Sequence, residues 1–319
     1  MRSLICEGAG KVRIRSVPDP RPRPGDALVR IEASAVCGSE RATLRNGMDG
    51  NTGHEACGIV VEPGTSAFHA GDRVGLTAVT GCGECARCAA GQELHCERGP
   101  KVSEGWHAEF AAVPASALRQ VRPGIDPGVA AMLTGDPLGV PARALHRAPS
   151  GPGDRVLVLG LGPVGLAHVV VRAFTGAEVI GIEPSPYRRD LALRLGAKAA
   201  LSPDDEIPRN ARLVIECTGR EDCIRQAFDL VENAGTVLQS GECHVDVPLN
   251  PSELFIRREI TYTGSWYYAT EDYAHMCELV DRGLPLRELC THDVAAADAQ
   301  PAITDFLQAL SGKVILRWV

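Results

Sequence analysis

The chain has 319 residues, 45% of them hydrophobic and 23% charged, and carries a formal net charge of −7. These values are ordinary for a globular protein, and the length allows two domains with a core each. An acidic chain with no block of basic residues is not expected to bind nucleic acid or an anionic membrane surface.

The N-terminal residues and the number of cysteines bear on where in the cell the protein is expected. The opening residues MRSLICEGAG lack the long apolar run of a signal peptide, and the most apolar stretch, 156–171, is interrupted by glycines and Pro163. We therefore expect a cytoplasmic protein without a membrane span. In that setting 12 cysteines favour thiolate or metal chemistry over disulfides.

The first third of the chain reads as short β-strands. Residues 27–35, 59–62 and 73–76 have strand patterns, and glycine-containing turns lie between them. Closely spaced short strands of this kind predict a compact, barrel-like β domain.

Three loop segments of this region contain metal-binding residue types: Cys37-Gly-Ser-Glu40, Gly53-His54-Glu55 and Asp136-Pro-Leu. Taken singly, a cysteine or histidine in a β domain is more often a packed core residue. Together, a thiolate, an imidazole and carboxylates predict a zinc site with three protein ligands and an open position, as catalytic zinc requires. Glu40 is the candidate carboxylate partner of the ligating imidazole.

Residues 81–97 form a glycine-rich, poorly apolar loop with four cysteines, Cys82, Cys85, Cys88 and Cys96. Four thiolates at this spacing can close a tetrahedral zinc site of the structural kind. Four unrelated buried cysteines would not gather in such a loop. An iron–sulfur cluster is the other option, although the spacing differs from both common ferredoxin patterns.

From residue 139 the pattern changes to alternating strands and helices. A strand at 155–159 leads into GLGPVG at 160–165, followed by a helix at 166–174 and a strand at 178–182. In such a crossover Gly160 allows the tight turn, Gly162 lets the backbone approach a pyrophosphate, and Gly165 lets helix and strand pack closely. The helix N-terminus then faces the phosphates.

Further strands at 213–216, 236–239 and 260–264, with helices at 186–195 and 222–231, predict a doubly wound parallel sheet. Glu183 follows Gly160 by 23 residues, close to the usual position of a carboxylate that binds a ribose hydroxyl. A glycine-rich turn without a ligand is the alternative, but dinucleotide binding explains more. The expected cofactor-binding residues are Gly160, Gly162, Pro163, Val164, Gly165, Glu183, Arg188, Thr218, Gly219, Ser240 and Gly241.

The chain resembles the medium-chain zinc-dependent alcohol and polyol dehydrogenases, in particular the sorbitol- and threonine-dehydrogenase-like branch. The motifs CGSE, GHE, the four-cysteine loop, EGWHAEFAAVP, DPL, GLGPVG, ECTG and GKVIL occur in the right order over nearly the whole length. The resemblance implies a GroES-like β catalytic domain (1–138 and 268–319), with the zinc loop at 81–97, and a Rossmann domain (139–267). It also implies a homodimer or homotetramer.

The resemblance implies roles for individual residues. Cys37 and His54 correspond to catalytic zinc ligands, Glu55 to a glutamate that ligates or exchanges with water, and Asp136 to the acidic ligand of the polyol-oxidising branch. Ser39 corresponds to the hydroxyl that passes the substrate's proton. The four cysteines of residues 81–97 correspond to the structural zinc site.

Three departures from the family pattern carry information. The segment between Cys37 and His54 is shorter than usual, and Asp136 is shorter than the common glutamate. Many relatives have a proton-relaying histidine where this chain has Ala42. Proton release through Ser39 is therefore expected to use water, Glu55 or the cofactor ribose.

We expect NAD-linked interconversion of a secondary alcohol and a ketone, with a polyol, sugar or aminocyclitol as the substrate by analogy. The Glu183 carboxylate would repel the 2′-phosphate of NADP, whereas Arg188 and Arg189 could pair with it. Small molecules are the only partners expected besides further copies of the chain. The aromatic and imidazole side chains of Trp106, His107, Trp266 and Tyr267 could line the substrate site or pack in the core.

Two other functions stay open from the sequence. One is a zinc-independent enone or quinone reductase of the same fold, and the other is a non-catalytic NAD(P)-binding protein. Cys37, His54 and the cysteine loop weigh against both.

Overall fold

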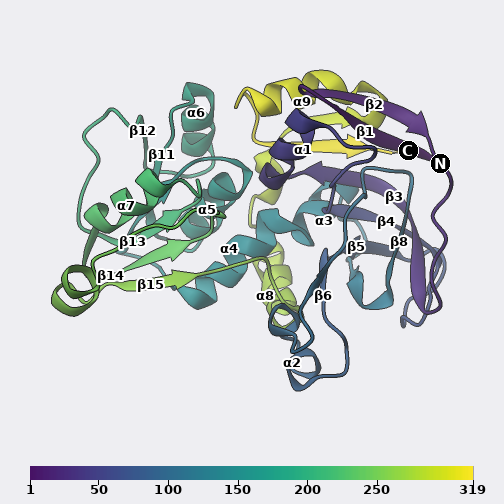
Figure 1. Cartoon of the computed structure of the whole chain (residues 1–319), viewed down its shortest axis with the longest axis horizontal. Coiled ribbons are helices and arrows are strands. Elements are labelled where there is room, and N and C mark those ends of the chain that lie inside the picture. The colour runs from purple at the N-terminus through teal and green to yellow at the C-terminus, as the bar shows by residue number, and fades with distance from the viewer. Residues whose placement is uncertain (319) are drawn as a thin grey trace. The chain divides into compact units, whose positions relative to one another are not determined.

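The computed structural model describes residues 1–318 and divides into two compact units (Figure 1). The first unit comprises Met1–Gly139, Tyr267–Glu278 and the C-terminal part from Cys290, and the second comprises Val140–Trp266 and Leu279–Leu289. Val319, the last residue of the expected catalytic domain, lies outside the described residues. Within residues 1–318, no helix combines the length and the apolar character that crossing a bilayer requires.

Strand β3 (Asp26–Val36) is the centre of the first unit's main sheet. Its alternate residues are fully buried because successive side chains of a strand point to opposite faces: Ala27, Val29, Ile31, Ala33 and Ala35. One side of β3 pairs with β4 (Ala56–Glu62), and the other is shared by β8 (Phe110–Pro114) and β17 (Lys313–Arg317). The C-terminal strand thus completes this sheet.

The same sheet has the order β16-β17-β3-β4-β5-β9, with β5 at Arg73–Leu76, β9 at Leu118–Gln120 and β16 at Cys290–Ala295. The remaining strands of the unit form two small sheets: β1 (Arg2–Gly8) with β2 (Lys11–Ser16), and β6 (Val79–Thr80) with β7 (Lys101–Val102). Its helices are α1 (Arg41–Asn46), α2 (Ala86–Ala89), α3 (Pro127–Leu133) and α9 (Ala299–Leu307). Helix α4 spans Asp136–Arg147 and α8 spans Thr270–Asp281.

The second unit contains a six-stranded parallel sheet with the order β12-β11-β10-β13-β14-β15 (Figure 1). Its elements are β10 (Arg155–Leu159), α5 (Pro163–Phe174), β11 (Glu178–Ile182), α6 (Pro186–Arg194), β12 (Ala199–Leu201), β13 (Ala211–Glu216), α7 (Glu221–Leu230), β14 (Val231–Gln239) and β15 (Thr261–Gly264). The strand order reverses between β10 and β13, and right-handed crossovers then place α5 and α6 on one face and α7 on the other. The predicted fold class, a GroES-like β domain with a doubly wound Rossmann domain, is confirmed.

Several element boundaries differ from those expected. Helix α5 begins at Pro163 rather than at residue 166. Proline lacks an amide hydrogen, but the first position of a helix does not need one, and the fixed φ of proline suits the helix start. Helices α1, α2, α3, α4 and α9 were not expected. Helix α3 begins at Pro127 and is capped by Asp126, whose carboxylate accepts hydrogen bonds from the amides of Gly128 and Val129.

Candidate metal centres and nucleotide site

Four predicted ligands come together in the first unit: Cys37, His54, Glu55 and Asp136, whose metal-binding atoms all lie within 4.8 Å of one another. Cys37 follows β3, and His54 and Glu55 precede β4. Since these strands are antiparallel neighbours, the end of one lies beside the beginning of the other. Asp136 reaches the same point from the beginning of α4.

The contacts within this cluster are short. The Sγ of Cys37 donates to Oδ2 of Asp136 at 2.9 Å, and Nε2 of His54 lies 3.2 Å from the same oxygen. The other ring nitrogen of His54, Nδ1, lies 2.8 Å from the carbonyl oxygen of Thr52. A carbonyl can only accept, so Nδ1 carries a proton, and Nε2 is the ring nitrogen that faces the cluster and could bind a metal.

The expected pairing of Glu40 with the ligating imidazole is wrong. The carboxylate of Glu40 instead accepts from the amide of Cys37 at 2.7 Å and contacts His107 at 2.9 Å. The Thr52 carbonyl takes its place beside His54 because it lies only two residues away in the same loop.

The donor set fits a zinc ion. Burial, followed by the charge of Asp136, raises the pKa of Cys37 to about 11. Burial lowers the pKa of His54, but its hydrogen bonds with Asp136 and Cys37 outweigh this and raise it. Burial raises the pKa of Asp136, but its hydrogen bonds with His54 and Cys37 outweigh burial and lower the pKa, so its carboxyl is ionised. A divalent cation would displace the protons on the Cys37 sulfur and the His54 nitrogen, and this ligand combination suits zinc. The side chains of His54 and Asp136 are each 14% exposed, so one side of the cluster is open.

Lys313 is a member of this site that sequence reasoning missed. Its Nζ lies 2.7 Å from the Glu55 carboxylate, and the two side chains are 2% and 0% exposed. Burial is the largest single influence and lowers the pKa of Lys313. The charge of Glu55, the other negative charges of the cluster and the hydrogen bond to Glu55 together outweigh burial and raise the pKa above its ordinary value. The motif GKVIL contains this lysine, yet only the pairing of β17 with β3 brings it to Glu55.

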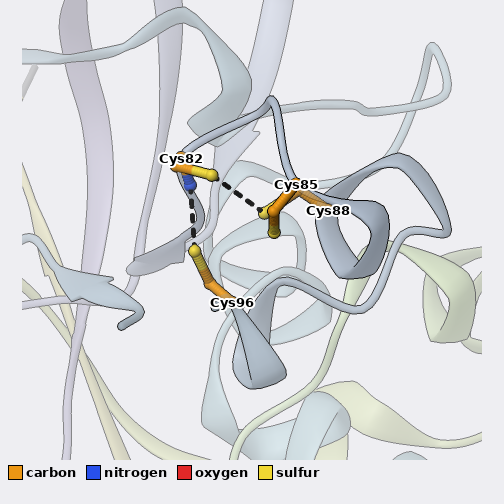
Figure 2. Close-up of side chains that lie close together, drawn as sticks. All are labelled: Cys82, Cys85, Cys88 and Cys96. Carbon is orange, nitrogen blue, oxygen red and sulfur yellow. Dashed lines mark hydrogen bonds between the residues drawn. The ribbon is translucent and has the colours of Figure 1, made fainter. Parts of the chain in front are cut away.

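The four cysteines of residues 81–97 form the second cluster (Figure 2). The amide of Cys82 donates to Sγ of Cys96 at 3.4 Å, and the Sγ atoms of Cys82 and Cys88 are 4.0 Å apart. Hydrogen bonds from the backbone of Glu97 and Cys88 lower the pKa of Cys85 to about 6, which favours its thiolate. These four side chains fit a closed tetrahedral zinc site.

The predicted nucleotide loop lies at the carboxyl end of β10. Gly160 has φ of +85°, which the tight turn requires. A Cβ on Gly165 would lie 1.9 Å from the carbonyl oxygen of Gly160, so α5 packs directly against the end of the strand. A Cβ on Gly162 would meet nothing within 4 Å, so this glycine lies beside open space at the helix N-terminus. Pro163, the first residue of the helix, is buried, and Val164 is half-buried.

The other expected cofactor residues lie on neighbouring strand ends. A Cβ on Gly160 would approach Thr218 to 2.5 Å, and one on Gly241, next to Ser240, would approach the amide of Gly219 to 2.4 Å. Glu216, which was not predicted, orders these loops: its carboxylate accepts from the amides of Thr218 and Gly219 at 2.7 and 2.9 Å.

Glu183 and Arg188 lie deeper than expected. The Glu183 carboxylate accepts from the amides of Leu161 and Ser185 at 2.8 and 3.0 Å, and its side chain ties β11 to the glycine-rich loop. Arg188 is 5% exposed, and Arg189 donates to the carbonyls of Glu183 and Pro184.

Two glycine variants are expected to separate folding from cofactor binding. Gly165→Ala places a methyl group against backbone, so we expect a loss of more than about 2 kcal/mol in the stability of the second unit. Gly162→Ala meets free space, so stability should stay near wild type while NAD affinity falls at least about 10-fold, because the backbone no longer approaches the pyrophosphate. Thermal melts and NADH fluorescence titration measure the two effects. Equal stability of the two variants would contradict this account.

The remaining predicted residues divide into buried and exposed ones. Trp106, His107 and Tyr267 are at most 4% exposed and pack in the first unit, whereas Trp266 is 44% exposed. Ser39 lies exposed in the short 3₁₀ turn Gly38–Glu40, directly after Cys37.

Comparisons with known proteins agree with this geometry. Residues 23–123 match the family model described as an alcohol dehydrogenase GroES-like domain, and residues 163–282 match the one described as a zinc-binding dehydrogenase. The L-threonine 3-dehydrogenase of Deinococcus deserti is 30% identical, covering 94% of this chain and 93% of its own. The chain belongs to the medium-chain zinc-dependent alcohol and polyol dehydrogenases. The family expected from the sequence is thereby confirmed.

Two further relatives of this dehydrogenase bear on its substrate and cofactor. L-galactonate-5-dehydrogenase of Escherichia coli is 28% identical, covering 89% of this chain and 88% of its own. A zinc-binding dehydrogenase from Sinorhizobium meliloti, solved with NADP bound, superposes with a TM-score of 0.84 at 26% identity, covering 99% of this chain and 98% of that one.

Proposed function

We propose that this dehydrogenase interconverts a secondary alcohol of a polyol, sugar, sugar acid or aminocyclitol and the corresponding ketone, with NAD(H) as the hydride carrier. The observation that carries the proposal is the cluster of Cys37, His54 and Asp136, in which sulfur and imidazole nitrogen lie 2.9 and 3.2 Å from one carboxylate oxygen. The activity named for the galactonate-oxidising relative supports the substrate class.

We propose a separate role in zinc binding for each side chain of the cluster. Cys37, His54 and Asp136 would hold the catalytic zinc, which supplies a Lewis acid that lowers the pKa of a substrate hydroxyl. Glu55 was expected as a further ligand. Because Lys313 lies 2.7 Å from its carboxylate, we propose that Glu55 contributes negative charge beside the site and binds the metal only when it leaves Lys313.

Ser39 is the proposed proton acceptor. It lies exposed two residues after Cys37, so its hydroxyl can accept a proton from the substrate and release one to solvent. Since position 42 is alanine rather than histidine, water completes the relay. Oxidised NAD supplies the hydride acceptor.

A screen of polyols, sugar acids and amino alcohols with NAD tests the function. We expect NADH to form with at least one of these secondary alcohols, and a metal chelator to abolish the reaction. Reduction of an enone or quinone that is insensitive to chelation would contradict the proposal.

The preferred cofactor is proposed to be NAD, although one relative was solved with NADP. The buried carboxylate of Glu183 would face the 2′-phosphate of NADP at the end of β11 and repel it. Replacing Glu183 with glutamine should raise the ratio of kcat/KM for NADP over NAD by roughly 10-fold, because that repulsion is lost. Glu178→Gln, at the other end of the same strand, is the control. An unchanged ratio in Glu183→Gln would refute the role of this carboxylate.

The other expectations from the family remain proposals. They are a structural zinc held by Cys82, Cys85, Cys88 and Cys96, a catalytic domain of residues 1–138 and 268–319 around a cofactor domain of residues 139–267, a homodimer or homotetramer, and a cytoplasmic location.

A further inference from the structure

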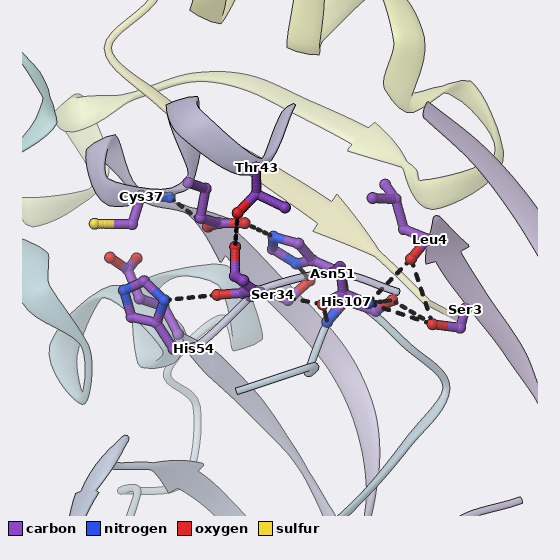
Figure 3. A network of polar contacts seen from close by, with 12 residues as sticks. Ser3, Leu4, Ser34, Cys37, Thr43, Asn51, His54 and His107 are labelled. Atoms are coloured by element: carbon purple, nitrogen blue, oxygen red, sulfur yellow. Dashed lines mark hydrogen bonds and ion pairs between the residues drawn. The ribbon is translucent and has the colours of Figure 1, made fainter. Parts of the chain in front are cut away.

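A buried polar network surrounds His107 in the first unit (Figure 3). The imidazole of His107 and the carboxylate of Glu40 are each 2% exposed, and Nε2 of the ring lies 2.9 Å from Oε2 of the carboxylate. Polar groups buried to this degree are retained where their hydrogen bonds fix a conformation. His107 binds no metal in the proposed function.

One arm of the network reaches the loop of Cys37. While Oε2 of Glu40 contacts His107, Oε1 of the same carboxylate accepts from the amide of Cys37 at 2.7 Å. The imidazole is therefore connected through one rigid, buried carboxylate to the backbone of the first ligand.

A second arm reaches the loop of His54. The side-chain oxygen of Asn51 accepts from the amides of both Gly53 and His107, at 3.1 Å each. Gly53 lies directly against the imidazole, since a Cβ there would be 2.6 Å from Cγ of His107. Its close approach sets the path of the backbone one residue before His54.

The ring itself is held from its other side. Nδ1 of His107 lies 2.8 Å from Oγ of Ser34, and the indole of Trp318 donates to that same oxygen at 2.9 Å. Because Trp318 already donates to Ser34, the hydroxyl proton of Ser34 is available for Nδ1. Nε2 then carries the ring proton and donates it to Glu40.

We propose that His107 is a positioning residue for the catalytic zinc, which fixes the loops of Cys37 and His54 relative to each other. This inference rests on the proposed function, since it requires a metal between these two ligands. Outer groups that orient metal ligands typically contribute 10- to 100-fold to affinity.

The test uses the zinc-loaded, full-length enzyme with the variant His107→Phe, which keeps a planar ring and removes both ring hydrogen bonds. Zinc release to a chelating dye is followed for each site. We expect the zinc held by Cys37 to leave about 10- to 100-fold faster than in wild type, and the zinc of the cysteine loop to leave at the wild-type rate. With Co²⁺ in the catalytic site, the visible absorption bands should shift.

Trp318→Phe is the matched control, because it removes a hydrogen bond of the same network that touches neither ligand loop. It should release both zinc ions at wild-type rates. If His107→Phe does not fold, Glu40→Ala replaces it in the test. This variant removes the carboxylate that connects His107 to the Cys37 amide and leaves the contacts through Asn51 in place, so it should also accelerate zinc release from the catalytic site.

Release rates and Co²⁺ spectra like wild type in a folded His107→Phe enzyme would overturn the inference. So would equal acceleration of release from both sites, which would indicate general destabilisation. These readouts need no turnover, so they hold even if no polyol is oxidised. A wild-type chain with no metal at Cys37 would overturn both the inference and the proposed function.

Discussion

Replacing Cys37 with alanine is expected to abolish alcohol oxidation while NAD still binds. The thiolate is one of three proposed ligands, and the two that remain, His54 and Asp136, are too few to retain zinc in water. Loss of the Lewis acid should lower kcat by at least roughly 10³-fold, because the negative charge that develops on the substrate oxygen is no longer stabilised. The glycine-rich loop belongs to the other unit, so NAD affinity should change less than about 3-fold.

Steady-state kinetics, zinc analysis and NADH fluorescence measure these effects. Cys57→Ala is the matched control: Cys57 is also fully buried, lies on β4 and belongs to neither cluster of ligands. It should retain both zinc ions and its activity. A Cys37→Ala enzyme that keeps wild-type turnover would contradict the assignment of this thiolate.

Replacing Lys313 with methionine is expected to destabilise the fold strongly. The substitution leaves the Glu55 carboxylate without its cation at 2.7 Å, in a place where neither side chain is more than 2% exposed. Removing one partner of a buried pair typically costs 3–5 kcal/mol, because the other charge stays buried and uncompensated. For a chain of this size the midpoint of thermal unfolding should fall by on the order of 10 °C.

The double variant Lys313→Met with Glu55→Gln is the decisive comparison. It removes both charges and should recover most of the lost stability, since a neutral amide is far less costly to bury. Thermal melts of the single and double variants measure this recovery. If Lys313→Met melts within about 2 °C of wild type, the ion pair does not stabilise the fold as argued.

Much of the fold could be predicted because its signals are local. The run from Arg155 to Leu159, the glycines of GLGPVG and the strand that ends before Glu183 each carry a pattern that a short window contains. The four-cysteine loop is likewise recognisable from spacing alone. Cys37, His54 and Asp136 could be named as a group through the resemblance, and the antiparallel pairing of β3 and β4 accounts for the approach of the first two.

What the sequence does not reveal depends on contacts between distant segments. Lys313 lies 258 positions from Glu55, and only the pairing of β17 with β3 brings the two together. His107 was expected to line the substrate site or to pack in the core. Nothing near it in the sequence indicates that it would form hydrogen bonds with Glu40 and Ser34. A carboxylate was expected beside His54, because metal-binding histidines commonly donate to one. In the structure the Thr52 carbonyl, from the same loop, occupies that position.

Zinc-edge anomalous diffraction from crystals of the wild-type enzyme is the decisive test of the proposed catalytic centre. We expect two peaks per chain, one among the four cysteines and one about 2.3 Å from Sγ of Cys37 and about 2.1 Å from Nε2 of His54. An enzyme that oxidises alcohols with no anomalous peak between Cys37 and His54 would contradict it.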